Sequence, residues 1–406
     1  MTLFNYTVLP LVFVSGVWIP ATLLCCIPWV QKQMLYLHWV TMWPGKWLHE
    51  PERAGFLKNQ VARFRIPTQD GERLFAWLIA PLGVYAEHAE EFINEKSGVD
   101  GDIEDKMAFK LLRDDPEARL LVYFHGNSAT IAQGRRTEEY RMYSSGASDK
   151  IFTLTFDYRG FGRSTGSPSE TGLLNDGTSV LEWALNLANV SSDRIVLLGH
   201  SLGTAVATGV AHHYINHEPP VQFSGLILGA AFTNSGSAFT AYSLADVFPI
   251  LAPVKTIPLF QAWFSRRMVD TWDTSERLAH LISKSPSFRL VLVHAKDDTT
   301  MPWDQSEEIF KSTVQAGVLA SQISENSTLT DEEIVEKVGI VDLGEAGRQE
   351  VWSQGQRSVS KLIANHGGHN TMMKWGPVSL ALLQCFDLVP TSSTRALSVG
   401  ETRSPI

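Results

Sequence analysis

Ser201 stands in a sequence pattern that could make it a nucleophile. It is the centre of the run GHSLG over residues 199–203, which matches the pattern G-x-S-x-G. Between a strand and a helix this pattern forces the serine into a strained turn, and small flanking residues keep that turn free of clashes. An apolar run precedes it at residues 194–198, and a helical pattern follows at residues 202–215. The context therefore predicts that Ser201 is a catalytic nucleophile.

A serine hydroxyl is a weak nucleophile at neutral pH, so it needs a histidine base and a carboxylate that holds the imidazole in the correct tautomer. With a G-x-S-x-G serine, the acid and then the histidine follow along the chain. An apolar run over residues 289–293 is followed by two aspartates, which we expect at the carboxyl end of a strand, where α/β sites are assembled. Asp298 is the predicted acid, and Asp297 is its rival.

Two histidines lie in a glycine-rich segment that follows these aspartates. They occur in the run NHGGHN over residues 365–370, ahead of the apolar stretch at residues 378–383. A loop histidine is usually a solvated surface residue, but its place in the chain order favours a catalytic role here. His369 is the predicted base, and His366 is the alternative.

Acyl transfer also needs two hydrogen-bond donors for the negative charge that develops on the substrate oxygen. One predicted donor is the backbone N–H of Leu202, directly after the serine. The other is expected in the run HGNS over residues 125–128, which follows the apolar residues 120–124. Glycine lets the chain turn closely there, and we predict that the N–H of Asn127 completes the oxyanion hole.

Other spacings in the chain do not predict a cofactor or a nucleic-acid site. His213 and His217 have the i, i+4 spacing of a zinc pair but lack the glutamate of H-E-x-x-H, and the three cysteines fit neither a zinc site nor a disulfide framework. The glycines of residues 160–166 do not match a phosphate loop. A formal charge of -9 gives no electrostatic footprint for nucleic acid. We therefore expect no metal, no cofactor and no nucleic-acid partner.

The elements that must position these groups alternate between strands and helices. Short apolar runs, typical of parallel strands covered on both faces, are separated by helical patterns at residues 172–190 and 202–215. This alternation predicts an α/β fold whose mostly parallel central sheet is flanked by helices. A hairpin is expected before it, from residues 61–67 and 73–79. The apolar runs are residues 120–124, 151–156, 195–198, 226–228 and 290–293.

The length of 406 residues and composition shifts predict one large body with additions. We expect an N-terminal membrane anchor and interfacial segment, a catalytic domain with two insertions, and a flexible tail. The first insertion, rich in phenylalanine and proline, is interpreted as a cap over the site, and the second is polar. The expected bounds are residues 1–50 for the anchor, 51–390 for the domain, 232–284 for the cap, 312–360 for the polar insertion and 391–406 for the tail.

Residues 8–30 carry no charged side chain, and at about 1.5 Å per helical residue they can cross a hydrocarbon layer of roughly 30 Å. We predict a single transmembrane helix. The rival is a cleaved signal peptide, which would leave a soluble secreted esterase, but no basic residue precedes the run. Aromatic residues at 32–47 suit a lipid interface, or else pack on the body. Basic residues after the span favour a cytosolic body, whereas sequons at Asn189 and Asn326 would need a lumenal one.

Taken together, these motifs resemble the α/β-hydrolase superfamily over most of residues 60–390. Within it, the chain resembles the α/β-hydrolase domain-containing protein 12 group, membrane-anchored serine hydrolases that act on monoacylglycerols and lysophospholipids. The resemblance selects Asp298, four residues before Pro302, as the acid and His369, which follows a glycine, as the base. It also implies the endoplasmic-reticulum membrane. The motifs that carry it are residues 125–127 (HGN), 157–164 (DYRGFGRS), 199–203 (GHSLG), 294–302 (HAKDDTTMP) and 368–369 (GH).

The prediction is thus a membrane-anchored serine hydrolase that cleaves an acyl ester of a lipid, a monoacylglycerol or a lysophospholipid, through an acyl-enzyme. An apolar cap and a membrane tether both suit a substrate that diffuses within a bilayer. One alternative is a thioesterase that removes acyl groups from protein cysteines with the same triad. Another is a membrane scaffold that keeps the fold without the reaction.

Overall fold

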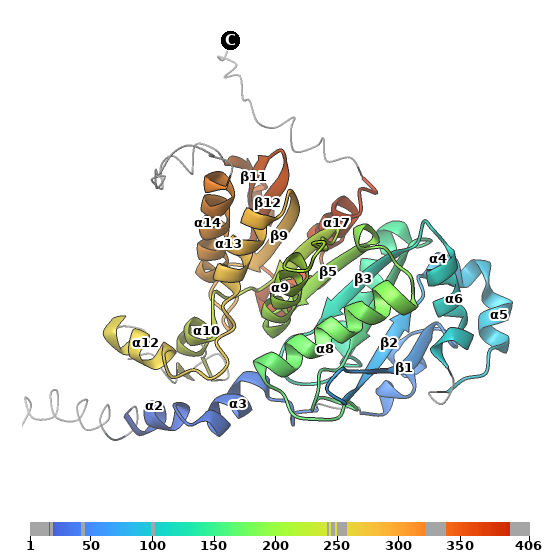
Figure 1. Cartoon of the computed structure of the whole chain (residues 1–406), viewed down its shortest axis with the longest axis horizontal. Helices are drawn as coiled ribbons and strands as arrows, with labels where there is room; N and C mark the ends of the chain where they lie inside the picture. Colours follow the sequence, from blue (N-terminus) through green and yellow to red (C-terminus); the bar gives the residue numbers. More distant parts are fainter. Residues whose placement is uncertain are drawn as a thin grey trace, which may run out of the picture.

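The computed structural model describes residues 16, 19–41, 45–98, 102–241, 243–244, 248–249, 258–320 and 338–389. Its centre is a ten-stranded sheet in the order β1-β2-β4-β3-β5-β6-β9-β12-β11-β10 (Figure 1). A separate two-stranded hairpin pairs β7 (Ser243–Leu244) with β8 (Phe248–Pro249). The sheet strands are β1 (Val61–Pro67), β2 (Arg73–Ile79), β3 (Arg119–Phe124), β4 (Ile151–Phe156), β5 (Ile195–His200), β6 (Gly225–Gly229), β9 (Ser287–Ala295), β10 (Gly339–Asp342), β11 (Gly347–Gln354) and β12 (Gln356–Ala364).

The middle of the sheet is parallel and both of its edges are antiparallel. The strands from β4 to β12 in sheet order pair parallel, whereas β1, β2, β10 and β11 pair antiparallel with their neighbours. Strand β3 explains why the apolar runs are continuous: Val122 and Phe124 face one hydrophobic cluster, and Leu121 and Tyr123 face another. A strand covered on both faces needs apolar side chains at every position. The predicted α/β fold is confirmed.

Helices cover both faces of the sheet. The α8, α9, α13 and α14 helices pack on one face and share a core with the even-numbered residues of β3, while α7 and α17 pack on the other. Figure 1 shows α8 and α9 in front of the sheet and α17 behind it. These helices are α7 (Gly134–Tyr143), α8 (Glu170–Glu182), α9 (Leu202–Ile215), α13 (Thr274–Lys284), α14 (Asp304–Leu319) and α17 (Gly376–Cys385). Shorter helices are α2 (Ile19–Cys25), α3 (Pro28–Tyr36), α4 (Leu82–Glu87), α5 (Ala89–Asn94), α6 (Met107–Asp114), α10 (Ser235–Ala241), α12 (Pro258–Ser265) and α16 (Gly368–Thr371).

The polar insertion expected at residues 312–360 is not an insertion over most of its length. Its first residues complete α14, and residues 339–354 form β10 and β11, which extend the sheet. Its last residues belong to β12, which pairs parallel with β9 along its whole length. The sequence did not predict β10 and β11 because they carry many polar side chains. These two strands form an edge of the sheet that is partly open to solvent.

The last part of the cap expected at residues 232–284 belongs instead to the helices that cover the sheet. Helix α13 packs against α9 and α14 in that layer, so of the described helices in this range only α10 and α12 remain outside it. The strongly acidic sequence over residues 85–115 includes α5 and α6, which bury Phe92, Phe109 and Leu112 in the core. Their acidic residues lie on the outside of helices whose other face is apolar.

The predicted membrane span at residues 8–30 lies mostly outside the described residues. Its described part holds α2 and the start of α3, separated by a turn, because Pro28 lacks an N–H and begins a new helix. Among the described helices, none is both long enough and apolar enough to cross a bilayer. The span therefore stays a prediction. The tail expected at residues 391–406 lies outside the described residues.

Candidate active site

Ser201 occupies a sharp turn between β5 and α9, at the carboxyl edge of the parallel strands. Its backbone has φ 52° and ψ −120°, a strained conformation for a residue with a side chain. A Cβ atom at Gly199 would lie 2.4 Å from the carbonyl oxygen of Gly203, and a Cβ at Gly203 would lie 2.0 Å from that of Phe124. Both glycines of the motif are therefore required by the close approach of helix and strand. The strained turn is held by the Ser201 N–H, which donates to the Gly229 carbonyl at 2.9 Å.

Asp298 and His369 meet across the sheet edge. His369 Nδ1 lies 2.8 Å from Asp298 Oδ2, and His294 Nε2 lies 3.2 Å from the same oxygen. The other carboxylate oxygen accepts the N–H groups of Thr300 and Met301 at 2.9 and 2.8 Å. Burial opposes ionisation of Asp298, but the hydrogen bonds from the two histidines outweigh it and hold the pKa of this carboxyl below its usual value. Asp298 is thus a fixed, ionised partner for the His369 ring.

The two rival residues have other positions. Asp297 is exposed, and its carboxylate accepts the N–H groups of Gly368 and Gly367 at 2.8 and 3.2 Å. It therefore fixes the loop that carries His369 instead of contacting the ring. His366 is exposed and lines a separate pocket with Trp375. Of the predicted alternatives, the geometry brings together Asp298 and His369.

His200 holds the backbone of His369, a contact that the sequence reasoning missed. Its Nε2 lies 2.8 Å from the carbonyl oxygen of His369, and its side chain is buried. Burial, together with the neighbouring His369, lowers the pKa of His200 to about 3, so the ring is neutral at physiological pH. A neutral ring with hydrogen on Nε2 donates to that carbonyl. Its position directly before the nucleophile, at the end of an apolar strand, was the available signal.

The loop after β3 brings Asn127 next to the serine. A Cβ at Gly126 would lie 3.3 Å from Ser201 Cβ, so this loop passes over the nucleophile. The buried Arg136 donates to the carbonyls of Gly126, Asn127 and Ser128 at 3.1, 3.2 and 3.1 Å. Because a trans peptide points its C=O and N–H in opposite directions, the Asn127 N–H faces away from Arg136. The Leu202 N–H opens α9 and has no partner within the helix.

The segment that includes α3 supports the same loop from outside. The Ser128 and Ala129 N–H groups donate to the carbonyls of Tyr36 and Val40 at 3.0 and 2.7 Å. Both residues have φ 57°, in the left-handed region, so the turn needs such external bonds to persist. Tyr36, expected as part of an interfacial belt, is instead fully buried in the body.

Two pockets meet at Ser201. The apolar pocket has a volume of about 540 Å³, and the polar pocket has one of about 760 Å³. Ser201, Asn127 and Thr300 line both pockets, so the serine lies at their junction. The remaining lining of the apolar pocket includes Met34, Leu35, Phe232, Ala238, Phe239 and Met301. The remaining lining of the polar pocket includes Gln133, Arg135, Arg136, Glu139, His369 and Asn370.

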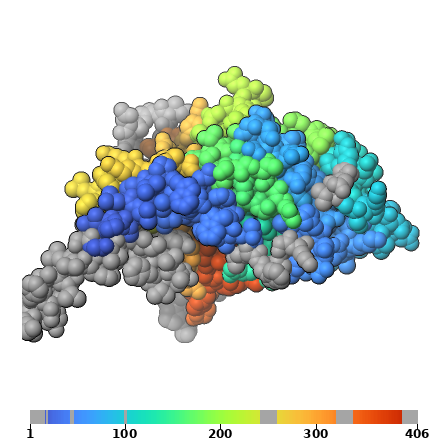
Figure 2. All heavy atoms as spheres, turned by 90° about the horizontal axis from the view of Figure 1, so that it is seen from below, coloured from blue at the N-terminus to red at the C-terminus, as the bar shows by residue number. Residues whose placement is uncertain are grey.

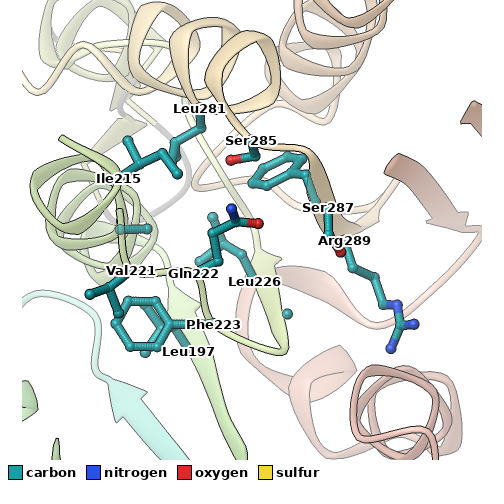
Figure 3. A pocket seen from close by; sticks show the side chains of 13 residues that line it. Leu197, Ile215, Val221, Gln222, Phe223, Leu226, Leu281, Ser285, Ser287 and Arg289 are labelled. Atoms are coloured by element: carbon teal, nitrogen blue, oxygen red, sulfur yellow. The ribbon is translucent and has the colours of Figure 1, made fainter. Parts of the chain in front are cut away.

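Another pocket lies at the opposite edge of the sheet. It is about 360 Å³ and gathers apolar side chains such as Ile215, Val221 and Leu281, near the amino ends of β6 and β9 (Figure 3). Its one charged side chain, Arg289, extends away from the others in Figure 3 and donates to the carbonyl of Gln384 at 2.6 Å. This pocket holds none of the predicted site residues.

The described residues hold no cluster of ligands suited to a metal ion. His213 and His217 contact each other through their Nε2 atoms at 3.0 Å on the surface. Within the described part of the chain no third ligand joins them, and the two surface rings meet edge to face with an interplanar angle of 77°.

Comparison with known proteins adds an independent finding. A model of the alpha/beta hydrolase family matches residues 121–348. The lysophosphatidylserine lipase ABHD12 of Danio rerio is 25% identical over 312 residues, which are 75% of this chain and 72% of the relative. The lipase of the same name from Rattus norvegicus is 26% identical over 70% of this chain and 63% of the relative.

More distant similarity covers part of the chain or only its fold. Protein ABHD12B of Homo sapiens is 31% identical over 47% of this chain and 49% of the relative. The crystal structure of an alpha-beta hydrolase from Vibrio vulnificus superposes with a TM-score of 0.52 at 14% identity, covering 87% of this chain and 92% of the other. That likeness concerns the fold alone.

Proposed function

The chain belongs to the alpha/beta hydrolase family, and from that premise we propose that it is a lipase that removes the acyl chain of a lysophospholipid at a membrane surface. It is a serine ester hydrolase. The observation that carries the proposal is the strained Ser201 at the junction of the two pockets. His369 lines the polar pocket with it, and the ring of His369 contacts Asp298.

The proposed mechanism assigns each residue one step. His369 takes the hydroxyl proton of Ser201 while the serine oxygen attacks the ester carbonyl, and Asp298 stabilises the imidazolium. The N–H groups of Leu202 and Asn127 hold the oxyanion. Collapse of the intermediate breaks the ester bond, and His369 gives its proton to the leaving glycerol oxygen. Water, deprotonated by His369, then hydrolyses the acyl-serine and releases the fatty acid.

The apolar pocket supports a long acyl chain as the group that is transferred. Phe232 follows β6, and Ala238 and Phe239 come from α10, while Met34 and Leu35 come from α3. Pockets lined by apolar side chains with a few polar groups bind ligands that are mostly apolar. We propose that α10 and α12 belong to the cap over this acyl chain, on a catalytic domain over residues 51–390. The relatives named lysophosphatidylserine lipases make a lysophospholipid the favoured substrate, ahead of a monoacylglycerol.

Exposed apolar side chains support a position at a membrane. Leu23 and Leu24 on α2, Trp29 on α3 and Leu259 on α12 are between 53% and 84% exposed. Figure 2 shows the N-terminal segment in blue beside the yellow segment of α12 on one face of the molecule. A large exposed apolar surface marks a site of contact with lipid or protein. We propose a single-pass anchor at residues 8–30 and the endoplasmic reticulum as its compartment.

The test compares lipid hydrolysis by the wild-type chain and by Ser201→Ala. Purified protein in vesicles that contain lysophosphatidylserine or a monoacylglycerol should release fatty acid, with the lysophospholipid the better substrate. Ser201→Ala should lose activity by about 10⁴-fold or more, since a triad loses most of its rate with its nucleophile. Ser283→Ala removes an exposed serine hydroxyl on α13 and is the control. Lipid hydrolysis that survives in Ser201→Ala contradicts the proposal.

A further inference from the structure

The two pockets at Ser201 differ in charge as well as in polarity. The polar pocket shares Ser201 with the apolar pocket, and two guanidinium groups, Arg135 and Arg136, line it. Among the described residues, no carboxylate lies within ion-pair distance of either group. The single carboxylate in the lining is Glu139. The pocket thus carries excess positive charge at its wall.

The two arginines have different tasks. Arg136 is buried, and its N–H groups are taken up by carbonyls of the oxyanion loop, including Thr130 at 2.8 Å. Arg135 is exposed at the start of α7, where the backbone N–H groups of the first turn add positive potential. The nearby Glu138 carboxylate is bound to Lys374 at 2.7 Å. Arg135 is therefore the charged group of this wall that can bind a ligand.

The carboxylate in the lining does not cancel this charge. Glu139 is buried, and its carboxyl accepts the Tyr123 hydroxyl at 2.7 Å. Burial raises the pKa of Glu139 to about 7, so the group is only partly ionised at neutral pH.

We propose that the polar pocket binds the anionic head group of the substrate and that Arg135 pairs with its phosphate. This inference rests on the proposed function and deepens it. A lysophospholipid bound with its acyl chain in the apolar pocket places its glycerol at Ser201 and its phosphodiester in the polar pocket. A guanidinium fits phosphate oxygens with two parallel hydrogen bonds, which a neutral glycerol head group cannot reproduce. Arg135 is thus a specificity-determining residue.

The experiment measures kcat/KM in mixed micelles for three lipids with one acyl chain: lysophosphatidylserine, lysophosphatidylcholine and monoacylglycerol. Arg135→Gln should lower the value for both phospholipids by about tenfold or more, chiefly through KM, because a charged hydrogen bond is lost. The value for monoacylglycerol should change by less than about twofold. Arg135→Lys should restore part of the loss. Arg113→Gln, on α6 at the far end of the sheet, removes the same charge and serves as control.

A second readout uses the head group alone. Glycerophosphoserine should inhibit hydrolysis of a neutral short-chain ester by the wild-type chain, and this inhibition should weaken about tenfold in Arg135→Gln. Equal losses on all three lipids, or no loss on any, would overturn the assignment of Arg135 while leaving the hydrolase function intact. A different result would contradict the hydrolase function: the wild-type chain would cleave none of the three lipids.

Discussion

At the scale of single residues, two neighbouring histidines have different roles in the site because their surroundings differ. His369 faces the polar pocket and contacts an ionised carboxylate, whereas His200 is buried directly behind it and stays neutral. A charged His200 would place a cation beside the base and weaken its ability to take a proton. Burial of His200 therefore keeps a positive charge away from the base. It also makes the stability of the fold depend on pH.

This burial predicts how stability depends on pH. In the unfolded chain His200 binds a proton below about pH 6.5, whereas in the folded chain it stays neutral down to about 3. Protons in that window bind the unfolded state more strongly, so stability falls as pH falls. Between pH 7 and pH 5 the contribution is a loss of about 2 kcal/mol.

The measurement is urea unfolding of the wild-type chain and of His200→Gln at pH 7 and pH 5. Glutamine can donate to the His369 carbonyl but does not titrate, so the variant should lose about 2 kcal/mol less between these pH values than the wild-type chain does. Equal losses in the two proteins would show that His200 is not held neutral in the folded state.

At the scale of elements, the segment that includes α3 is a wall of the site. The fully buried Tyr36 donates its hydroxyl to Asp270 Oδ2 at 2.7 Å and accepts from Trp272 Nε1 at 3.3 Å, while its carbonyl accepts the Ser128 N–H. The side chain of Gln31 binds the same region, donating to the Arg267 carbonyl. One segment thus ties the cap connection to the oxyanion loop.

Tyr36→Phe should therefore weaken both the fold and the reaction. Loss of the hydroxyl leaves the half-buried Asp270 carboxylate and the buried Trp272 N–H without this partner, which destabilises the protein by about 1–3 kcal/mol. A looser oxyanion loop should lower kcat several-fold on a water-soluble ester, for which membrane contact is irrelevant. Trp39→Phe, at a 63% exposed position on the same segment, is the control. A Tyr36→Phe enzyme with unchanged kcat would show that the segment does not position the loop.

The sequence predicted those elements whose pattern is set by full burial. The runs that became β3, β4, β5, β6 and β9 are apolar at nearly every position, and the glycines around Ser201 marked the turn. Strand β12 escaped prediction because Lys361 lies in it, fully buried between Glu307 and Glu350. A buried ion network looks polar in sequence, since only the fold pairs its charges.

The part of the site that could be predicted is the part that follows from the order of the motifs along the chain. The motif gave Ser201, and the order of acid and base restricted the choice to the aspartates at 297 and 298 and the histidines at 366 and 369. Which aspartate contacts which histidine depends on where the side chains of these loops point. The sequence pattern of a loop does not predict that direction. The supporting roles of Arg136 and Tyr36 arise from contacts between distant segments and had no local pattern.

At the scale of the whole molecule, the site opens beside an apolar surface. The apolar pocket is lined by residues of α3 and α10, and the exposed apolar side chains lie on α2, α3 and α12. A substrate that stays in a bilayer can enter such a pocket without crossing water. The proposed membrane position therefore gives α12 a testable contact with lipid.

The prediction is that the double variant Leu259→Ser and Phe260→Ser loses activity several-fold on lysophospholipid in vesicles, but not on a water-soluble ester. The two side chains are 84% and 54% exposed, so their replacement should leave the fold stable. Leu380→Ser, at a 49% exposed position on α17, is the matched control. Equal activity of the double variant on both substrates would remove α12 from the membrane contact.

The most direct test of the account is to locate the nucleophile chemically. The full-length chain is treated with a fluorophosphonate probe, digested and sequenced by mass spectrometry. We expect one phosphonylated residue, Ser201, with labelling abolished in Ser201→Ala and strongly slowed in His369→Ala, because the imidazole activates the hydroxyl. An adduct on a different residue, or undiminished labelling of Ser201→Ala, would contradict the account.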